Sequence, residues 1–120
     1  NESGVTALAI SVGNVHLNTK KTSGINFGAL KAIEEVTTLP LVLHGGSGIP
    51  VNVRKRLAQE SRVSKFNIGT ELRMAFGNAL RKSLTDNCDS FDRIRLLAPT
   101  VDAVKSATIE VIRALNGKQE

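Results

Sequence analysis

The chain has 120 residues, of which 41% are hydrophobic and 22% are charged, a composition typical of one folded domain. Its apolar runs are far shorter than the roughly 20 residues that cross a bilayer, so we predict no membrane-spanning segment. We expect a cytoplasmic location, with a targeting sequence upstream of Asn1 left open. The net charge of +5 favours anionic small molecules over nucleic acid as partners, because no Tyr or Trp and only four Phe are present for base stacking. The single cysteine, Cys88, excludes an internal disulfide and a cysteine-based metal site.

Short β-type runs alternate with longer runs of helical period along the chain. We predict strands over residues 6–12, 41–44 and 63–68, each nearly continuous in apolar character, as in strands covered on both faces. Helices are predicted over residues 27–36, from Pro50 as the first helical residue, after Thr70 as a cap, and after Pro99. The predicted fold class is therefore α/β, with three βα units in a parallel sheet and a C-terminal helix.

The helix that follows Thr70 has one apolar face. Large apolar side chains recur there every four residues, at Leu72, Phe76, Leu80 and Leu84, and we expect this face to pack on the sheet. The run of charge at Arg54, Lys55 and Arg56 in the preceding helix is interpreted as an ordinary polar, solvated face.

A sheet of three βα units has two open edges, and such sheets usually continue into a wound sheet or close into an eight-stranded barrel of about 250 residues. No linker or low-complexity run divides the chain, so residues 1–120 are treated as a single domain that is part of a larger barrel. The first residues, NESG, show neither an initiator Met nor the plan of a secretory signal, and we interpret them as a cut end.

Both histidines of the sequence, His16 and His44, stand just past the end of a predicted strand. In parallel barrels that end carries the ligand-binding loops. Two imidazoles on neighbouring strands could share one Zn²⁺, which accepts nitrogen ligands and keeps one position open when it is catalytic. A pair of hydrogen-bonded structural histidines is the alternative explanation.

Glycine-rich loops follow the second and third predicted strands. Residues 44–50 (HGGSGIP) and residues 67–71 (NIGTE) each run from a strand into a helix N-terminus. Glycine lets backbone N–H groups approach an anion closely, and the helix end adds partial positive charge. Either loop alone could be a plain βα turn, but two adjacent loops of this kind favour a phosphate site.

Three motifs carry a resemblance to a known family. Residues 9–16 (AISVGNVH), 40–50 (PLVLHGGSGIP) and 67–73 (NIGTELR) resemble the last three strand motifs of class II, zinc-dependent ketose-bisphosphate aldolases of the fructose- or tagatose-bisphosphate type. The resemblance covers nearly the whole chain and implies the C-terminal part of a (β/α)8 TIM barrel. It implies a lyase of carbohydrate metabolism, such as glycolysis, that reversibly cleaves a ketose bisphosphate into dihydroxyacetone phosphate and an aldehyde. We expect the full-length protein to be a homo-oligomer.

The same resemblance assigns roles to individual residues. It implies that His16 and His44 are two of three histidine ligands to Zn²⁺, which would polarise the ketone and stabilise the enediolate. The substrate-binding residues that it implies are Gly45, Gly46, Ser47, Asn67, Ile68, Gly69, Thr70 and Arg73. The catalytic acid/base Asp and the third ligand come from an earlier strand in the family, so no catalytic residue is expected within this chain.

Two positions depart from the family pattern. Leu17 stands where the family usually has Gly after the histidine, and Gly69 stands where fructose-specific members often have Asp. A small residue at the latter position is typical of tagatose-type members. Leu17 and the missing Asp leave a second hypothesis open, a non-catalytic phosphate-binding or interaction domain derived from the same barrel.

Overall fold

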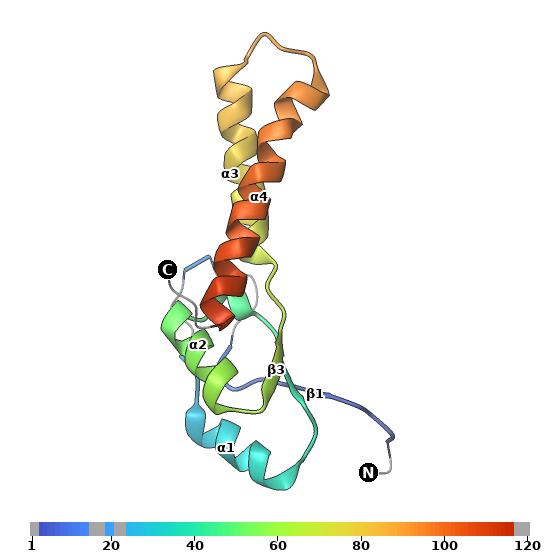
Figure 1. The fold of residues 1–120 in the computed structure, drawn as a ribbon, viewed down its shortest axis with the longest axis vertical. Helices are drawn as coiled ribbons and strands as arrows, with labels where there is room; N and C mark the ends of the chain where they lie inside the picture. Colours follow the sequence, from blue (N-terminus) through green and yellow to red (C-terminus); the bar gives the residue numbers. More distant parts are fainter. Residues whose placement is uncertain (1–2, 15–18, 21–23, 117–120) are drawn as a thin grey trace.

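The computed structural model describes residues 3–14, 19–20 and 24–116 (Figure 1). Its elements, in chain order, are β1 (Leu8–Ile10), α1 (Phe27–Val36), β2 (Leu41–Leu43), the 3-10 turn η1 (Gly46–Gly48), α2 (Val51–Glu60), β3 (Val63–Phe66), α3 (Thr70–Asp86) and α4 (Arg93–Asn116). The predicted α/β class and the three βα units are confirmed, with each strand shorter than predicted. No helix in the described ranges is both long and apolar enough to cross a membrane.

The three strands form one parallel sheet in the order β1-β2-β3. Ile10 of β1 lies opposite Leu43 of β2, and Leu43 in turn lies opposite Phe66 of β3. Because all three strands run in the same direction, their C-terminal ends meet at one edge of the sheet. The loops that carry the predicted site residues therefore leave from that edge.

The core lies between the sheet, α1 and α2. Its buried apolar residues are Ile10, Val12, Leu30, Leu41, Leu43, Ile49, Leu57 and Val63. Leu8 on β1 and Lys65 on β3 are exposed, so the prediction that every strand is covered on both faces is wrong for the two outer strands. In the part of the chain that the structure describes, β1 and β3 each have one neighbouring strand, whereas β2 has two.

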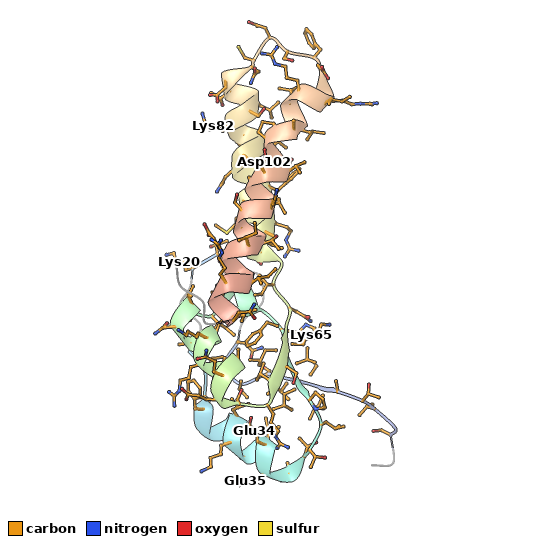
Figure 2. The ribbon with its side chains drawn as sticks, in the orientation of Figure 1. Lys20, Glu34, Glu35, Lys65, Lys82 and Asp102 are labelled. Atoms are coloured by element: carbon orange, nitrogen blue, oxygen red, sulfur yellow. The ribbon has the colours of Figure 1, made fainter. Side chains whose placement is uncertain are left out.

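Two polar residues set the start of α1 and anchor its end. The Asn26 side chain accepts a hydrogen bond from the Ala29 N–H at 2.9 Å, which satisfies one donor of the first helical turn. At the other end of α1, the Glu34 carboxylate accepts the backbone N–H of Arg62 at 2.7 Å, next to β3. Figure 2 shows Glu34 and Glu35 on α1, at the end of the molecule opposite the far tip of α3 and α4.

Helices α3 and α4 form a helical hairpin that extends away from the sheet (Figure 1). The longest dimension of the molecule is 59 Å, and the C-terminal part of α4 packs beside α2. The prediction that α3 packs its apolar face on the sheet is wrong, because α3 packs mainly on α4. Two residues of that predicted face, Phe76 and Leu84, are exposed.

The last helix also begins earlier than predicted. Helix α4 starts at Arg93 and continues through Pro99, at which the prediction placed its start. The Asp92 carboxylate accepts the backbone N–H groups of Ile94 at 2.9 Å and Arg95 at 3.4 Å. This N-terminal cap stabilises a helical turn before the proline, so Pro99 is accommodated inside the helix. Similarly, Pro50 is the N-cap of α2 and not its first helical residue.

Candidate functional site

A pocket of about 420 Å³ opens at the C-terminal ends of β2 and β3. The residues that line it are His44, Gly45, Ser47, Phe66, Asn67, Ile68, Gly69, Thr70 and Arg73. They come from two loops that are separate in sequence, the loop after β2 and the loop after β3 with the first turn of α3. Every lining residue except Phe66 belongs to the set predicted from sequence.

The loop after β2 turns sharply into α2. Gly45 has a φ of 64°, in the left-handed region, which favours glycine because a side chain there is strained. Two backbone hydrogen bonds close the turn, from the Gly48 N–H to the Gly45 carbonyl and from the Ile49 N–H to the Gly46 carbonyl. The turn places Ser47 against the first turn of α3.

Gly46 is the one predicted pocket residue of this loop that does not line the pocket. Its N–H donates to the Asn67 carbonyl at 3.0 Å, so this donor is already engaged within the fold. A Cβ on Gly46 would lie 2.9 Å from Ile68 Cγ1 and 3.3 Å from the Asn67 carbonyl oxygen. The glycine is therefore required for close approach of the two loops rather than for contact with an anion.

Two asparagines tie the strand ends together around His44. The Asn14 side chain accepts the Val12 N–H and donates to the His44 carbonyl, both at 2.7 Å. From the other side, Asn67 Nδ2 lies 3.2 Å from each ring nitrogen of His44. The imidazole is thus held at the pocket by its backbone and by its ring. The sequence alone did not predict this role of Asn14, although an amide two residues after an apolar predicted strand is a recognisable signal.

The structure describes one of the two predicted metal ligands. His44 lies at the pocket, whereas His16 lies outside the described residues, as does Leu17. Within the described ranges, no group of three His, Cys, Asp or Glu side chains could hold a metal ion. A catalytic zinc site takes three protein ligands. The described residues therefore supply one candidate ligand and do not complete such a site.

The first turn of α3 lies at the pocket, which Gly69 and Thr70 line. Gly69 is the N-cap and Thr70 is the first helical residue, so the prediction that Thr70 caps this helix is wrong. The capping oxygen comes from the other loop, because the Ser47 hydroxyl accepts the Glu71 N–H at 3.1 Å. The neighbouring N–H groups of this turn have no acceptor within the helix itself, and the helix dipole gives this end partial positive charge.

Arg73 supplies the cationic side chain of the pocket. Its guanidinium folds back over Gly69, with Nη1 3.1 Å from the place that a Cβ on residue 69 would occupy. Its Nη2 also donates to Thr70 Oγ1 at 3.4 Å. The absence of a side chain at position 69 leaves room for this conformation, which holds a positive charge beside the helix N-terminus.

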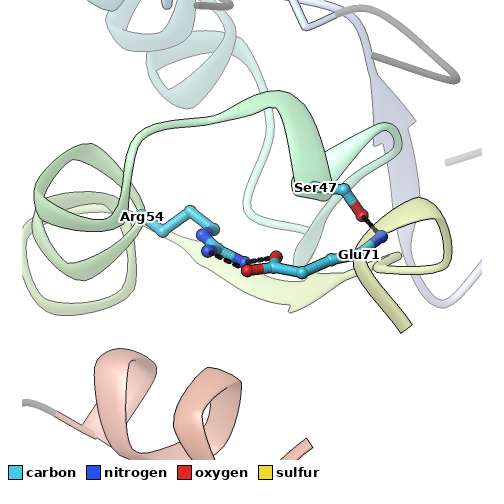
Figure 3. A network of polar contacts seen from close by, with 3 residues as sticks. All are labelled: Ser47, Arg54 and Glu71. Carbon is cyan, nitrogen blue, oxygen red and sulfur yellow. Dashed lines mark hydrogen bonds and ion pairs between the residues drawn. The ribbon is translucent and has the colours of Figure 1, made fainter. Parts of the chain in front are cut away.

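A buried ion pair lies next to Ser47 and the first turn of α3 (Figure 3). Arg54 of α2 is 1% exposed, and its Nη1 and Nη2 lie 3.0 Å and 3.4 Å from the two carboxylate oxygens of Glu71. The interpretation of Arg54 as part of a solvated face is wrong. Arg54 precedes the buried Leu57 by three residues, so both side chains lie on the inward stripe of α2.

Comparisons with known proteins show the family to which the chain belongs. A family model for class-II fructose-bisphosphate aldolases matches residues 1–120. The fructose-bisphosphate aldolase of Mycoplasma genitalium is 38% identical over 113 residues, covering 88% of this chain and 39% of the relative. The fructose-bisphosphate aldolase of Geobacillus stearothermophilus is 36% identical over 110 residues, covering 92% of this chain and 38% of the relative.

One further relative and one solved structure are similar to this chain. The 6-phospho-5-dehydro-2-deoxy-D-gluconate aldolase of Bacillus licheniformis is 34% identical over 114 residues, covering 93% of this chain and 38% of the relative. The crystal structure of the YdjI aldolase from Escherichia coli K12 superposes with a TM-score of 0.70 at 29% identity, covering 93% of this chain and 39% of that one. The chain thus spans about 39% of the length of proteins it matches, in agreement with the predicted C-terminal portion of a barrel.

Proposed function

Because the chain belongs to the class-II fructose-bisphosphate aldolase family, we propose that it forms the phosphate-binding part of an aldolase. The proposed reaction is the reversible cleavage of a ketose bisphosphate into dihydroxyacetone phosphate and an aldehyde. The observation that carries the proposal is the pocket of about 420 Å³ in which two loops bring eight of the predicted site residues together. Residues beyond this chain complete the proposed enzyme, because the chain spans about 39% of its relatives.

The pocket has the chemistry that a phosphate group requires. The N-terminus of α3 offers backbone N–H donors and partial positive charge at Gly69 and Thr70. Ser47 adds a hydroxyl, and Arg73 adds a guanidinium that pairs well with phosphate oxygens. The names of the relatives, fructose-bisphosphate aldolase and 6-phospho-5-dehydro-2-deoxy-D-gluconate aldolase, share a phosphorylated substrate. We therefore propose a phosphorylated ketose as the substrate.

His44, together with His16, is proposed to hold Zn²⁺ at the rim of this pocket. When bound, the metal supplies polarisation of the substrate carbonyl. The contribution of the described residues is to hold the backbone of His44 in place, since Asn14 Nδ2 donates to the His44 carbonyl at 2.7 Å. The third ligand and the acid/base Asp are proposed to come from residues beyond this chain.

The assembly of the enzyme is part of the same proposal. The helical hairpin exposes large apolar side chains, among them Phe91 and Ile94, and this supports a homo-oligomer in the full-length protein. We propose a cytoplasmic enzyme with a sugar-phosphate substrate and without nucleic-acid or membrane partners.

The proposal is tested by the release of dihydroxyacetone phosphate from fructose and tagatose bisphosphates by the full-length enzyme. We expect turnover that a chelator removes and Zn²⁺ restores, and His44→Ala should abolish it. Arg73→Ala should weaken substrate binding while the protein still folds. Full turnover in His44→Ala would contradict the proposed metal role, and no cleavage of any ketose bisphosphate would contradict the proposed reaction.

A further inference from the structure

We propose that Arg54 and Glu71 are positioning residues for the phosphate pocket, although neither of them lines it. The proposal rests on the proposed phosphate-binding function of the pocket. Their ion pair holds the first turn of α3 against η1, so that the Ser47 hydroxyl accepts the Glu71 N–H and keeps its own proton available for a phosphate oxygen.

The first step of the argument is the burial of Arg54. The Arg54 side chain is 1% exposed, whereas the Glu71 side chain is 22% exposed. A guanidinium without water needs an anionic partner, since a buried unpaired charge is strongly destabilising. Glu71 provides both carboxylate oxygens to it, at 3.0 Å and 3.4 Å. This two-pronged contact restrains the direction of the Glu71 side chain and hence the start of α3.

The second step is the link from the pair to the pocket. The backbone N–H of Glu71, the same residue, donates to Ser47 Oγ at 3.1 Å (Figure 3). A serine hydroxyl has one donor and two acceptor positions, so accepting this N–H leaves its O–H to donate elsewhere. Ser47 lines the pocket, whereas Arg54 and Glu71 are not among its lining residues. The ion pair therefore acts on a ligand through Ser47.

A second pair in α2 offers a matched control. Arg56 and Glu60 form an ion pair at 2.9 Å, with side chains that are 57% and 63% exposed. Exposed pairs at this spacing contribute little to stability. Glu60→Gln, like Glu71→Gln, therefore removes one carboxylate charge from an ion pair with an arginine of α2. It does so at a surface position that does not line the pocket.

The experiment compares Glu71→Gln, Arg54→Lys and Glu60→Gln by NMR titration with inorganic phosphate. We expect Glu71→Gln and Arg54→Lys to weaken phosphate binding about tenfold and to speed hydrogen exchange at the residue 71 amide, since each loses a charge-assisted contact. Glu60→Gln should leave both readouts unchanged. Two variants are used because one of them alone could unfold, and dispersed amide spectra show which of them retains the fold.

A double-mutant cycle separates positioning from a general structural role. In the Ser47→Ala background, Glu71→Gln should cause no further loss of phosphate affinity, because the route through the hydroxyl is already gone. Independent, additive losses would overturn the proposal. If the unmutated chain binds no phosphate, the proposed function of the pocket fails. The inference is then decided by exchange at the residue 71 amide in the ligand-free chain, and unchanged protection in Arg54→Lys overturns it.

Discussion

The sheet region buries large apolar side chains, whereas the helical hairpin leaves large apolar side chains exposed. In the sheet region, Leu41, Leu43 and Leu57 are fully buried, and even a charged residue, Arg54, is excluded from solvent. In the hairpin, the buried residues are the small polar Ser83 and Thr100, while Phe91 is 98% exposed. Among the described residues, full burial of large side chains is thus confined to the part of the chain that carries the pocket.

This difference has a functional consequence. A binding site must hold its groups within narrow limits, and side chains that are locked by packing do so best. The loops at the pocket leave directly from strands with buried side chains, and they are joined to each other by the hydrogen bond from Gly46 to Asn67. The hairpin, by contrast, begins at the pocket and extends away from it (Figure 1).

The largest expected effect is at the centre of the sheet. Leu43→Ala removes a side chain that is fully buried, and we expect it to lower the free energy of unfolding by ~2–5 kcal/mol through lost burial and a residual cavity. The same substitution at Leu84, which is 48% exposed on α3, should cost much less. Urea denaturation followed by circular dichroism measures both. Equal losses would mean that the hairpin contributes as much packing as the sheet.

The next effect concerns the joint between the two pocket loops. Gly46→Val adds a side chain whose Cβ would lie 2.9 Å from Ile68 Cγ1, which is too close. We therefore expect the free energy of unfolding to fall by ~1–3 kcal/mol and phosphate binding to weaken. Gly24→Val is the control, because a Cβ on Gly24 meets nothing within 4 Å. Unfolding curves and phosphate titrations report the two consequences. A Gly46→Val protein with unchanged stability and affinity would contradict the close-approach role.

A smaller effect is expected from charge at the pocket rim. Gly69→Asp sets a carboxylate beside the Arg73 guanidinium, and the resulting pair should reduce phosphate affinity by about tenfold. Gly69→Asn has nearly the same shape without the charge and should retain most of the affinity. Stability should not fall in either variant, since Asp and Asn are both good N-cap residues. Isothermal titration with phosphate compares them, and equal affinities would show that Arg73 does not contact the anion.

The smallest effect is expected at the tip of the hairpin. Phe91→Ser changes a side chain that is almost fully exposed, so the free energy of unfolding should change by less than about 0.5 kcal/mol. Phosphate affinity should also be unchanged, because the tip lies at the far end of α3 from Thr70, the residue of this helix that begins it and lines the pocket (Figure 1). Denaturation and titration of the same sample check both. A large loss would show that the tip is covered in solution.

The sheet and the pocket loops could be predicted from the sequence because the signals that specify them are local. Continuous apolar runs bounded by glycine and proline specify buried parallel strands without reference to distant residues. The glycines of residues 44–50 and 67–71 likewise indicate tight loops at strand ends. Parallel pairing then brings the two loops to the same edge, so the predicted residues other than Gly46 and the undescribed His16 line one pocket.

Features that depend on distant partners could not be predicted in the same way. The burial of Arg54 requires Glu71, which lies 17 residues later, and its neighbours Lys55 and Arg56 suggest a polar face. The packing of α3 on α4 competes with packing on the sheet, and periodicity alone does not choose between them. The start of α4 was misplaced because the cap at Asp92 outweighs the helix-breaking signal of Pro99.

The central claim, that the two loops form one phosphate site, is tested most directly by titrating the isotope-labelled chain with inorganic phosphate in the presence of a chelator. The account predicts saturable amide shifts that concentrate at Ser47, Gly69 and Thr70, and a marked loss of affinity in Ser47→Ala. Metal should not be needed for this binding, because the proposed donors are backbone N–H groups, a hydroxyl and a guanidinium. Shifts confined to the helical hairpin, or an unchanged affinity in Ser47→Ala, would contradict it.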